Sequence, residues 1–485
     1  MMPFVRGTLV ATGCALLTAC AVGPNYKRPA MDLSSAYKEQ DGWKPSAPAD
    51  ALDKGKWWEI YNDEVLNGLE EQVNISNNNV LAAAASVEES RALLRQAQSA
   101  FFPQVNLNAS RTRTVQGNGG GSTIVSGTGG ATTIVPSTTT AKTTTSTITE
   151  LGVSGNWEID LWGGIRRQTE SDRASLQASE AALANARLAA QGALATAYFQ
   201  LRAQDQLQAI LNDIVAAEQQ SLKITENRYR VGVAAKADVV TAQTQLLTSQ
   251  SQQVNAPLQR ALLEHSIAVL VGQQPANFSL PSTAMRTDVP TVPAGVPSTL
   301  LERRPDVAQA ERQVASANAQ IGVAISAFFP TLEITGSDDY RGNTISRLIR
   351  TANNIWSVGP TLALSVFDAG LRRAQVAQAR AAHASTVDNY RQTVLTALQQ
   401  VEDEITTLRV LEQQAVIEES AVKAAREAET LTLNQYKAGT VPYSSVIAAQ
   451  TTRLNSEETA LSVLSSRLQA SVSMVQALGG GWHQP

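Results

Sequence analysis

The chain has 485 residues, of which 43% are hydrophobic and only 5% aromatic, and its 39 Lys and Arg residues stand against 43 Asp and Glu residues. The resulting net charge of −4 provides no basic footprint for a nucleic acid, so nucleic-acid binding is not expected. Of the two cysteines, Cys14 lies in a predicted leader, which excludes an internal disulfide framework and a cysteine-based metal site in the mature chain.

Residues 1–19 have the pattern of a signal peptide. Arg6 provides a positive start, an uncharged apolar stretch follows, and small residues precede Cys20. The sequence Leu17-Thr18-Ala19-Cys20 is similar to a bacterial lipoprotein processing site, which predicts that Cys20 is acylated and becomes the new N-terminus. The alternative is an ordinary secretory signal with an incidental cysteine.

Four segments alternate apolar and polar side chains with the period of two that indicates half-buried strands. They lie at about residues 104–113, 147–161, 331–338 and 356–367. Their length suits a tilted strand in a bilayer, whereas no apolar run after the leader approaches the roughly 18 residues of a spanning helix. Since a barrel needs about eight strands, several chains must contribute to one. A soluble sandwich is the alternative.

The segment between the first two strands, residues 112–147, is rich in Gly, Thr and Ser. Such a composition cannot bury a core and predicts an exposed loop. A solvated linker is the favoured interpretation, and a receptor-binding loop is the alternative.

A very long helical segment follows each pair of strands. In the second copy apolar residues step by four and three, as in a coiled coil, at Val394, Leu398, Val401, Ile405, Leu408 and Leu411. A helix of about 65 residues would extend roughly 100 Å. Each ends near a glycine, Gly232 or Gly439, beyond which an antiparallel partner is expected. Pro257 interrupts only the first returning helix, which predicts a kink there.

The chain therefore carries one long pattern twice. Ala100-Phe101-Phe102-Pro103 returns at residues 327–330, and a period of roughly 205 to 230 residues fits two structural halves rather than a solenoid. The expected organisation is a signal peptide (1–19), an acylated N-terminal segment (20–60), repeat 1 (61–275, with short helices and a helical hairpin at 164–271), a linker (276–299), repeat 2 (300–478, with a helix at 306–327 and a hairpin at 370–478) and a tail (479–485).

Four stretches together resemble the outer membrane factor family, the TolC- and OprM-type channels of tripartite efflux and secretion systems, and above all its lipoprotein branch. They are residues 20–26 (CAVGPNY), the Trp57-Trp58 pair, residues 301–306 (LERRPD) and the two Phe-Phe-Pro turns. Each stretch is weak by itself, but the set covers the mature chain in the right order and is specific.

The resemblance implies a mixed α and β fold and a homotrimer, in which three chains of four strands form a 12-stranded transmembrane β-barrel continued by a periplasmic α-helical barrel. It implies a passive, lipid-anchored outer membrane channel for drugs or other small molecules. An inner-membrane pump of the resistance-nodulation-division (RND) type would deliver the cargo, together with a periplasmic adaptor. The adaptor would dock at the helical tip turns, which contain Tyr229, Arg230, Gly232, Lys437 and Gly439.

The resemblance also implies a periplasmic gate. Related channels bend the second hairpin inward and hold it with a tyrosine before the glycine turn. Here Tyr436 matches that tyrosine and Asp238 matches its carboxylate partner, which predicts a hydrogen bond between them. Val441 stands where relatives place a charge and is expected to form an apolar constriction. The alternative is that Tyr436 merely packs between helices and that Val441 faces a neighbour.

Neither catalysis nor a metal or cofactor is expected. The three histidines, His265, His383 and His483, lie on separate segments, none with a partner at metal-ligand or triad spacing. A competing function is a periplasmic coiled-coil structural lipoprotein, which would need no lipid-facing strands. Metal efflux and type I protein secretion compete with small-molecule efflux.

Overall fold

The computed structural model describes residues 21–31, 37–38, 56–117, 124–126, 132–134, 143–290, 292 and 303–480. The predicted leader and Cys20 lie outside these residues. Among the helices in the described ranges, none combines the length and the apolar character needed to cross a membrane. The chain divides into two compact units, one formed by residues 1–26, 92–173 and 316–383 and the other by 27–91, 174–315 and 384–485.

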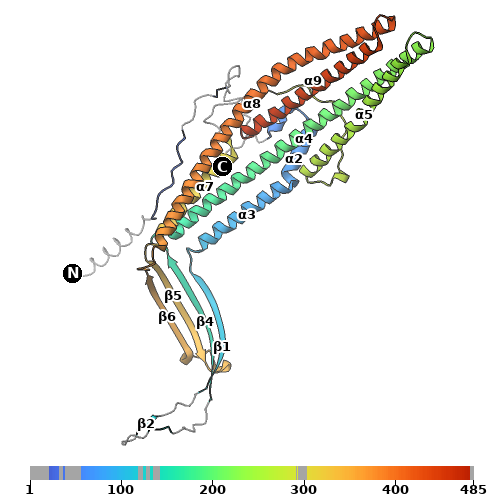
Figure 1. Ribbon diagram of the computed structural model, residues 1–485. Coiled ribbons are helices and arrows are strands. Elements are labelled where there is room, and N and C mark those ends of the chain that lie inside the picture. Colours follow the sequence, from blue (N-terminus) through green and yellow to red (C-terminus); the bar gives the residue numbers. More distant parts are fainter. Residues whose placement is uncertain are drawn as a thin grey trace. The chain divides into compact units, whose positions relative to one another are not determined.

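The first unit contains a four-stranded antiparallel sheet with the order β1-β4-β5-β6 (Figure 1). Its strands are β1 (Gln104–Gly117), β4 (Thr143–Ile159), β5 (Thr331–Gly342) and β6 (Asn354–Ala363). A short pair, β2 (Ile124–Ser126) and β3 (Thr132–Ile134), lies in the segment between β1 and β4.

The strand limits differ from the predicted ones at both ends of the sheet. β1 and β4 remain paired as far as Gly117 and Thr143, so part of the predicted loop at 112–147 is strand. The reason is its threonine content, because threonine is β-branched and favours strands even where the composition suggests a loop. β6 ends at Ala363, before the predicted 367, because its partner β5 begins opposite at Thr331.

The register separates the side chains of the sheet by polarity. Partners directly opposite each other share a face. One face carries polar pairs such as Ser154↔Ser337, Asn156↔Thr335 and Glu333↔Thr361. The other face carries Trp157↔Ile334 and Leu332↔Leu362. The predicted alternation is therefore confirmed, with Ser154 and Thr361 on one face and Trp157 and Leu362 on the other.

Two helical hairpins of matching length dominate the second unit (Figure 1). The first consists of α4 (Gly164–Arg230, 67 residues) and α5 (Lys236–Leu270, 35 residues). The second consists of α8 (Leu371–Ala438, 68 residues) and α9 (Tyr443–Ala477, 35 residues). α4 and α8 each begin in the first unit. The near-identical lengths agree with the predicted duplication. α5 is helical on both sides of Pro257.

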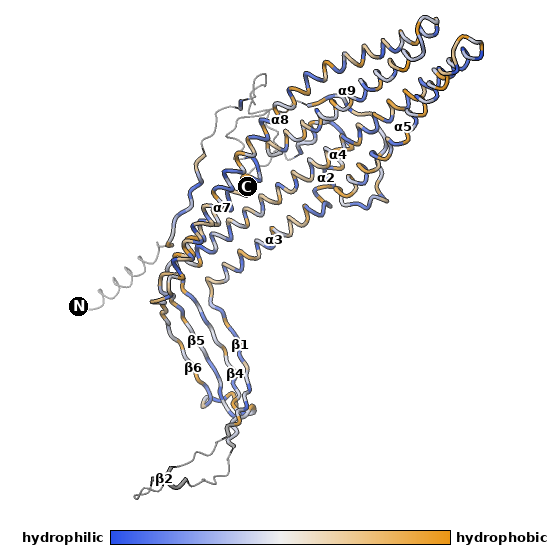
Figure 2. The backbone as a smooth tube through the Cα atoms, viewed as in Figure 1, coloured by the Kyte–Doolittle hydropathy of each residue, from blue (hydrophilic) through white to orange (hydrophobic). Residues whose placement is uncertain are grey.

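Hydrophobic and hydrophilic residues alternate along these helices (Figure 2), as expected for helices with one packed side and one exposed side. Shorter elements lie beside them: a 3-10 turn, η3 (Trp57–Tyr61), and the helices α2 (Glu64–Ser76), α3 (Asn78–Ser99) and α7 (Pro305–Ser326). Asp63 caps α2 by accepting the backbone N–H groups of Val65 and Leu66.

The main core of the second unit forms where η3 packs against the hairpins. Trp57, Trp58 and Tyr61 are buried together with Phe199 and Leu468. The polar ends of these aromatic rings have partners, since the Trp57 indole donates to Gln191 (3.2 Å) and the Tyr61 hydroxyl bonds to Ser471 (2.7 Å). The Trp-Trp stretch that is prominent in the sequence is thus a packing element.

The Arg-Arg-Pro-Asp stretch ties α7 to the end of α9. Arg304 forms a bidentate ion pair with Asp306 in the first turn of α7, at 3.0 and 2.7 Å. It also donates to the backbone carbonyl of Ala477, the last residue of α9, at 2.9 Å. This stretch therefore has a structural role, as expected from the position of Asp306 beside a helix N-terminus.

Candidate functional site at the tips of the hairpins

Both hairpins reverse direction through a glycine with a left-handed backbone. Gly232 has φ +78° and Gly439 has φ +82°, a conformation that other residues adopt only with strain. The backbone hydrogen bonds repeat as well, since Gly232 donates to the carbonyl of Tyr229 and Gly439 to that of Tyr436. The tight turns predicted at these two positions are therefore built in the same way.

The exposed part of the tips contains the residues predicted to bind an adaptor. Tyr229, Arg230 and Lys437 are exposed, as are the two turn glycines. Val231 and Val233, on either side of Gly232, are exposed apolar side chains whose exposure the sequence pattern did not predict. The first tip thus presents apolar and basic groups side by side.

Tyr436 is buried beneath the tips, with only 3% of its surface exposed. Its ring packs edge-on against Tyr443, with the centroids 5.2 Å apart. Its hydroxyl donates to Thr225 on α4 at 3.2 Å. The prediction that the Tyr436 hydroxyl bonds to Asp238 is therefore wrong. Asp238 lies in the first turn of α5, whereas the helix that faces the hydroxyl is α4.

Arg228 completes a contact between the two hairpins. It lies one turn after Thr225 on α4, and its guanidinium is 4.7 Å from the centre of the Tyr436 ring. Its Nη1 donates to the backbone carbonyls of Tyr436 (2.8 Å) and Lys437 (2.9 Å) at the end of α8. The Tyr436 carbonyl also accepts from the Gly439 N–H, so Arg228 is its second donor, and it provides a donor for the Lys437 carbonyl as well. Its guanidinium thereby places a positive charge at the negative helix end. We call Thr225, Arg228 and Tyr436 the tip clasp.

Within a single chain, the Val441 side chain is not fully exposed. It is half-buried and packs against the cluster of Ala242, Tyr436, Tyr443 and Val446. Because the cluster already covers part of its side chain, only the remainder is available to line a passage.

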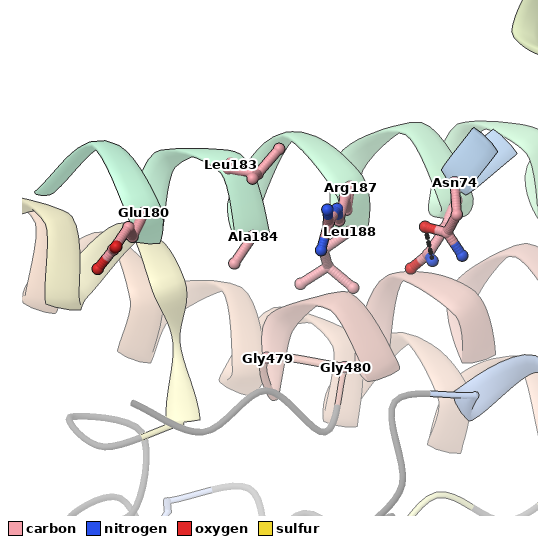
Figure 3. Close-up of a pocket in the computed structure, with 9 residues that line it drawn as sticks. Asn74, Glu180, Leu183, Ala184, Arg187, Leu188, Gly479 and Gly480 are labelled. Atoms are coloured by element: carbon pink, nitrogen blue, oxygen red, sulfur yellow. Dashed lines mark hydrogen bonds between the residues drawn. The ribbon is translucent and has the colours of Figure 1, made fainter. Parts of the chain in front are cut away.

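The described part of the chain also contains an open hollow of about 470 Å³ (Figure 3). Asn74 of α2, Leu188 and Gln191 of α4, and Gly480 after α9 line it. Gln191 donates to Asn74 at 3.1 Å. The charged groups in its lining are Glu180 and Arg187, and no nucleophile lies beside a base there. Across the described residues no group of three or more His, Cys, Asp or Glu side chains could hold a metal ion.

Comparisons with known proteins converge. A family model described as outer membrane efflux protein matches residues 69–273 and 296–480, one stretch in each repeat. The probable efflux pump outer membrane protein TtgC of Pseudomonas putida is 27% identical, over 98% of this chain and 95% of that protein. The pyoverdine export outer membrane protein OpmQ of Pseudomonas aeruginosa is 28% identical, over 99% and 97%.

Solved structures have the same fold. The outer-membrane channel OprN aligns with a TM-score of 0.84 and 27% identity, over 96% of this chain and all of that chain. The open state of the Neisseria gonorrhoeae MtrE outer membrane channel aligns with a TM-score of 0.80 and 21% identity, over 96% and 99%.

Proposed function

Because this chain belongs to the outer membrane efflux protein family, we propose that it is the passive exit duct for small molecules delivered by an inner-membrane pump of the RND type through a periplasmic adaptor. The chain is an efflux channel component and not an enzyme. The observation that carries the proposal is the match of both repeats to the family, together with a sheet that has one apolar and one polar face.

The names of the relatives support small organic cargo. They include an antibiotic efflux protein and a toluene efflux protein of Pseudomonas putida and a pyoverdine export protein of Pseudomonas aeruginosa. The cation efflux protein CusC of Escherichia coli, 26% identical, supports metal ions as a second candidate. Recovery of the inner-membrane partner with the assembled complex distinguishes the two, because the pump selects the cargo.

A homotrimer is supported by surfaces that a single chain leaves uncovered. β1 and β6 are the edges of the sheet, and an exposed edge is a template for pairing with another chain. Three such sheets provide 12 strands, enough for a closed barrel. Exposed apolar side chains also recur at heptad spacing on two helices: Val240, Leu247 and Val254 on α5, and Val410, Ile417 and Leu431 on α8.

The channel is tested with purified protein. In detergent it should run as a trimer that resists heating, and in planar bilayers it should conduct ions. A non-conducting monomer, soluble once the lipid is removed, would instead support the coiled-coil stalk.

Lipid attachment at Cys20 is part of the proposal. The residues that follow Cys20 are held at the beginning of α4, where Val22 donates to the carbonyl of Trp162 (3.0 Å) and Arg167 donates to Asn25 (2.9 Å). In this arrangement the acyl chains would enter the membrane near the end of β4. Ala21 lacks the aspartate that retains many lipoproteins in the inner membrane, which favours the outer membrane.

The anchor should be partly redundant, because the strands of three chains already hold the trimer in the membrane. We expect a Cys20→Ser protein, exported with a non-lipoprotein signal, to retain substantial efflux activity, measured as drug resistance in a strain without its own channel. If the well-exported variant fails to assemble in the membrane at all, the lipid is essential.

The tip clasp is proposed as the periplasmic gate, because it joins the second hairpin to the first. Tyr436→Phe removes one buried hydrogen bond, worth about 1 kcal/mol per protomer, or roughly fivefold in a closed-to-open ratio. Arg228→Ala removes two charge-assisted bonds and a cation–π contact, and should cost about 2 to 3 kcal/mol. Conductance in planar bilayers should rise in both variants, more in the second.

Asp238→Asn is the matched control for the clasp. The Tyr436 hydroxyl bonds to Thr225 and not to Asp238, so this variant should conduct as the wild type does. A larger effect from Asp238→Asn than from Arg228→Ala, with trimers intact in both, would move the gate to the α5 side of the tip.

A further inference from the structure

A layer of polar side chains lies buried between the two hairpins, one to two turns from the tip clasp. Glu218 and Ser221 of α4, Ser249 of α5 and Gln450 of α9 are each at most 2% exposed. Gln245 of α5 donates to Glu218 at 3.0 Å. Gln450 donates to Ser221 at 3.2 Å, across the boundary between the hairpins. The layer therefore involves helices of both repeats.

The layer has fewer hydrogen-bond donors than its acceptors require. Among the described residues, three of its buried atoms have no partner: Glu218 Oε2, Ser249 Oγ and Gln450 Oε1, one from each of three helices. An ionised carboxylate and an amide oxygen only accept, so the Ser249 hydroxyl is the single donor among the three. Unpaired polar atoms in a buried site cost free energy. A proton on Glu218 Oε2 would supply a second donor and would also remove the buried charge.

The electrostatic surroundings of Glu218 also favour its protonated form. The residues of α5 beside Glu218 are Gln245 and Ser249, which are uncharged. On the second hairpin, the titratable groups near Glu218 are the buried Glu429 of α8 and Tyr443 of α9. Arg453 of α9 pairs with Glu429 (2.7 Å) and with Glu457 (3.1 Å), so it offsets part of the charge of Glu429. Glu218 belongs to the first hairpin and Glu429 to the second, so Glu429 acts on Glu218 as a like charge from the other hairpin.

The balance of these effects favours the neutral carboxyl. Burial raises the pKa of Glu218, the hydrogen bond from Gln245 and the nearby hydroxyl of Ser249 lower it, and the charge of Glu429 raises it again. The net direction is upward from the ordinary value. Separation of the hairpins would expose Glu218 to water and return its pKa to about 4.3.

We propose that Glu218 is a proton-binding site that holds the two hairpins together when protonated and drives them apart when ionised. The inference rests on the proposed gate at the hairpin tips. The closed arrangement binds the proton more tightly than the open one. Closure is therefore most favourable below about pH 4.3, and it is lost as the pH rises from there through the higher pKa of the closed state.

The test is the pH dependence of conductance. For purified trimers in planar bilayers at constant salt, the open-to-closed ratio of the wild type should rise as the pH increases from 4.5, by at most about tenfold per pH unit for each protomer, and should level off once the pH exceeds the pKa of the closed state. Glu218→Gln should stay closed at every pH, because its amide provides the missing donor and carries no charge. Glu226→Gln, two turns further along α4 and exposed, should respond to pH as the wild type does.

Heat-resistant trimers confirm that each variant is folded. If Glu218→Gln does not assemble, Glu429→Gln is the second test, since loss of the opposing charge should weaken the pH response. The proposal is overturned if Glu218→Gln responds to pH as the wild type does. If only Glu429→Gln assembles, the same response in that variant overturns it. Conductance of the wild type that does not depend on pH overturns it as well. Absence of conductance in the wild type at every pH would instead contradict the proposed channel.

Discussion

Leu362→Arg is expected to abolish assembly of the channel in the outer membrane, whereas Thr361→Arg at the neighbouring position should assemble. Leu362 is 66% exposed in the single chain and pairs with Leu332 on the apolar face of the sheet. An arginine facing lipid near the middle of the bilayer costs about 2 to 4 kcal/mol, and a trimer incurs that cost three times. Thr361 lies on the polar face directly opposite Glu333, where an arginine gains an oppositely charged neighbour.

The two variants control for each other, since the same residue is introduced at adjacent positions of one strand. The measurement is the amount of heat-resistant trimer in isolated outer membranes, normalised to total expressed chain. Equal assembly of both variants would show that the apolar face does not contact lipid, and would leave the barrel without support.

The faces of the sheet could be predicted from the sequence because alternation is a local property. Each residue's side is fixed by its parity along the strand, and the pairing Trp157↔Ile334 follows the predicted pattern. The strand ends could not be predicted in the same way, because they depend on where the partner strand ends. β6 stops at Ala363 although alternating residues continue beyond it, since β5 provides no further partner.

At the tips, the sequence predicted the tyrosine and the turn but not the partner. Which helix of the first hairpin faces Tyr436 depends on the rotation of α4 and α5 about their axes, and a coiled-coil pattern defines this only loosely. The role of Arg228 could not be predicted from the sequence either. Arg228 stands where the second copy has Gln435, so only the first repeat can make this contact.

Glu70 is a buried acid that neither the motifs nor the periodicity revealed. It lies on α2 with 0% of its surface exposed, and both of its carboxylate oxygens lack a hydrogen-bond partner in the described chain. Burial raises its pKa to about 9. The folded protein therefore binds this proton more tightly than the unfolded chain does, so stability is complete below about pH 4.5 and declines as the pH rises from there to about 9.

We expect Glu70→Gln to stabilise the protein at pH 7.5 and not at pH 4.5. Each pH unit within the window costs the wild type about 1.4 kcal/mol, so the cost at pH 7.5 is about 4 kcal/mol per chain. The stabilisation gained by Glu70→Gln is smaller than this, because the buried amide of the glutamine is itself unpaired. The measurement is the thermal unfolding midpoint, followed by circular dichroism at both pH values. Glu71→Gln, an exposed neighbour paired with Lys56, is the control and should lack this pH-dependent gain. The prediction is contradicted if the unfolding midpoint of the wild type does not fall relative to that of Glu70→Gln as the pH rises. That result would mean that Glu70 finds a partner or water in the assembled trimer.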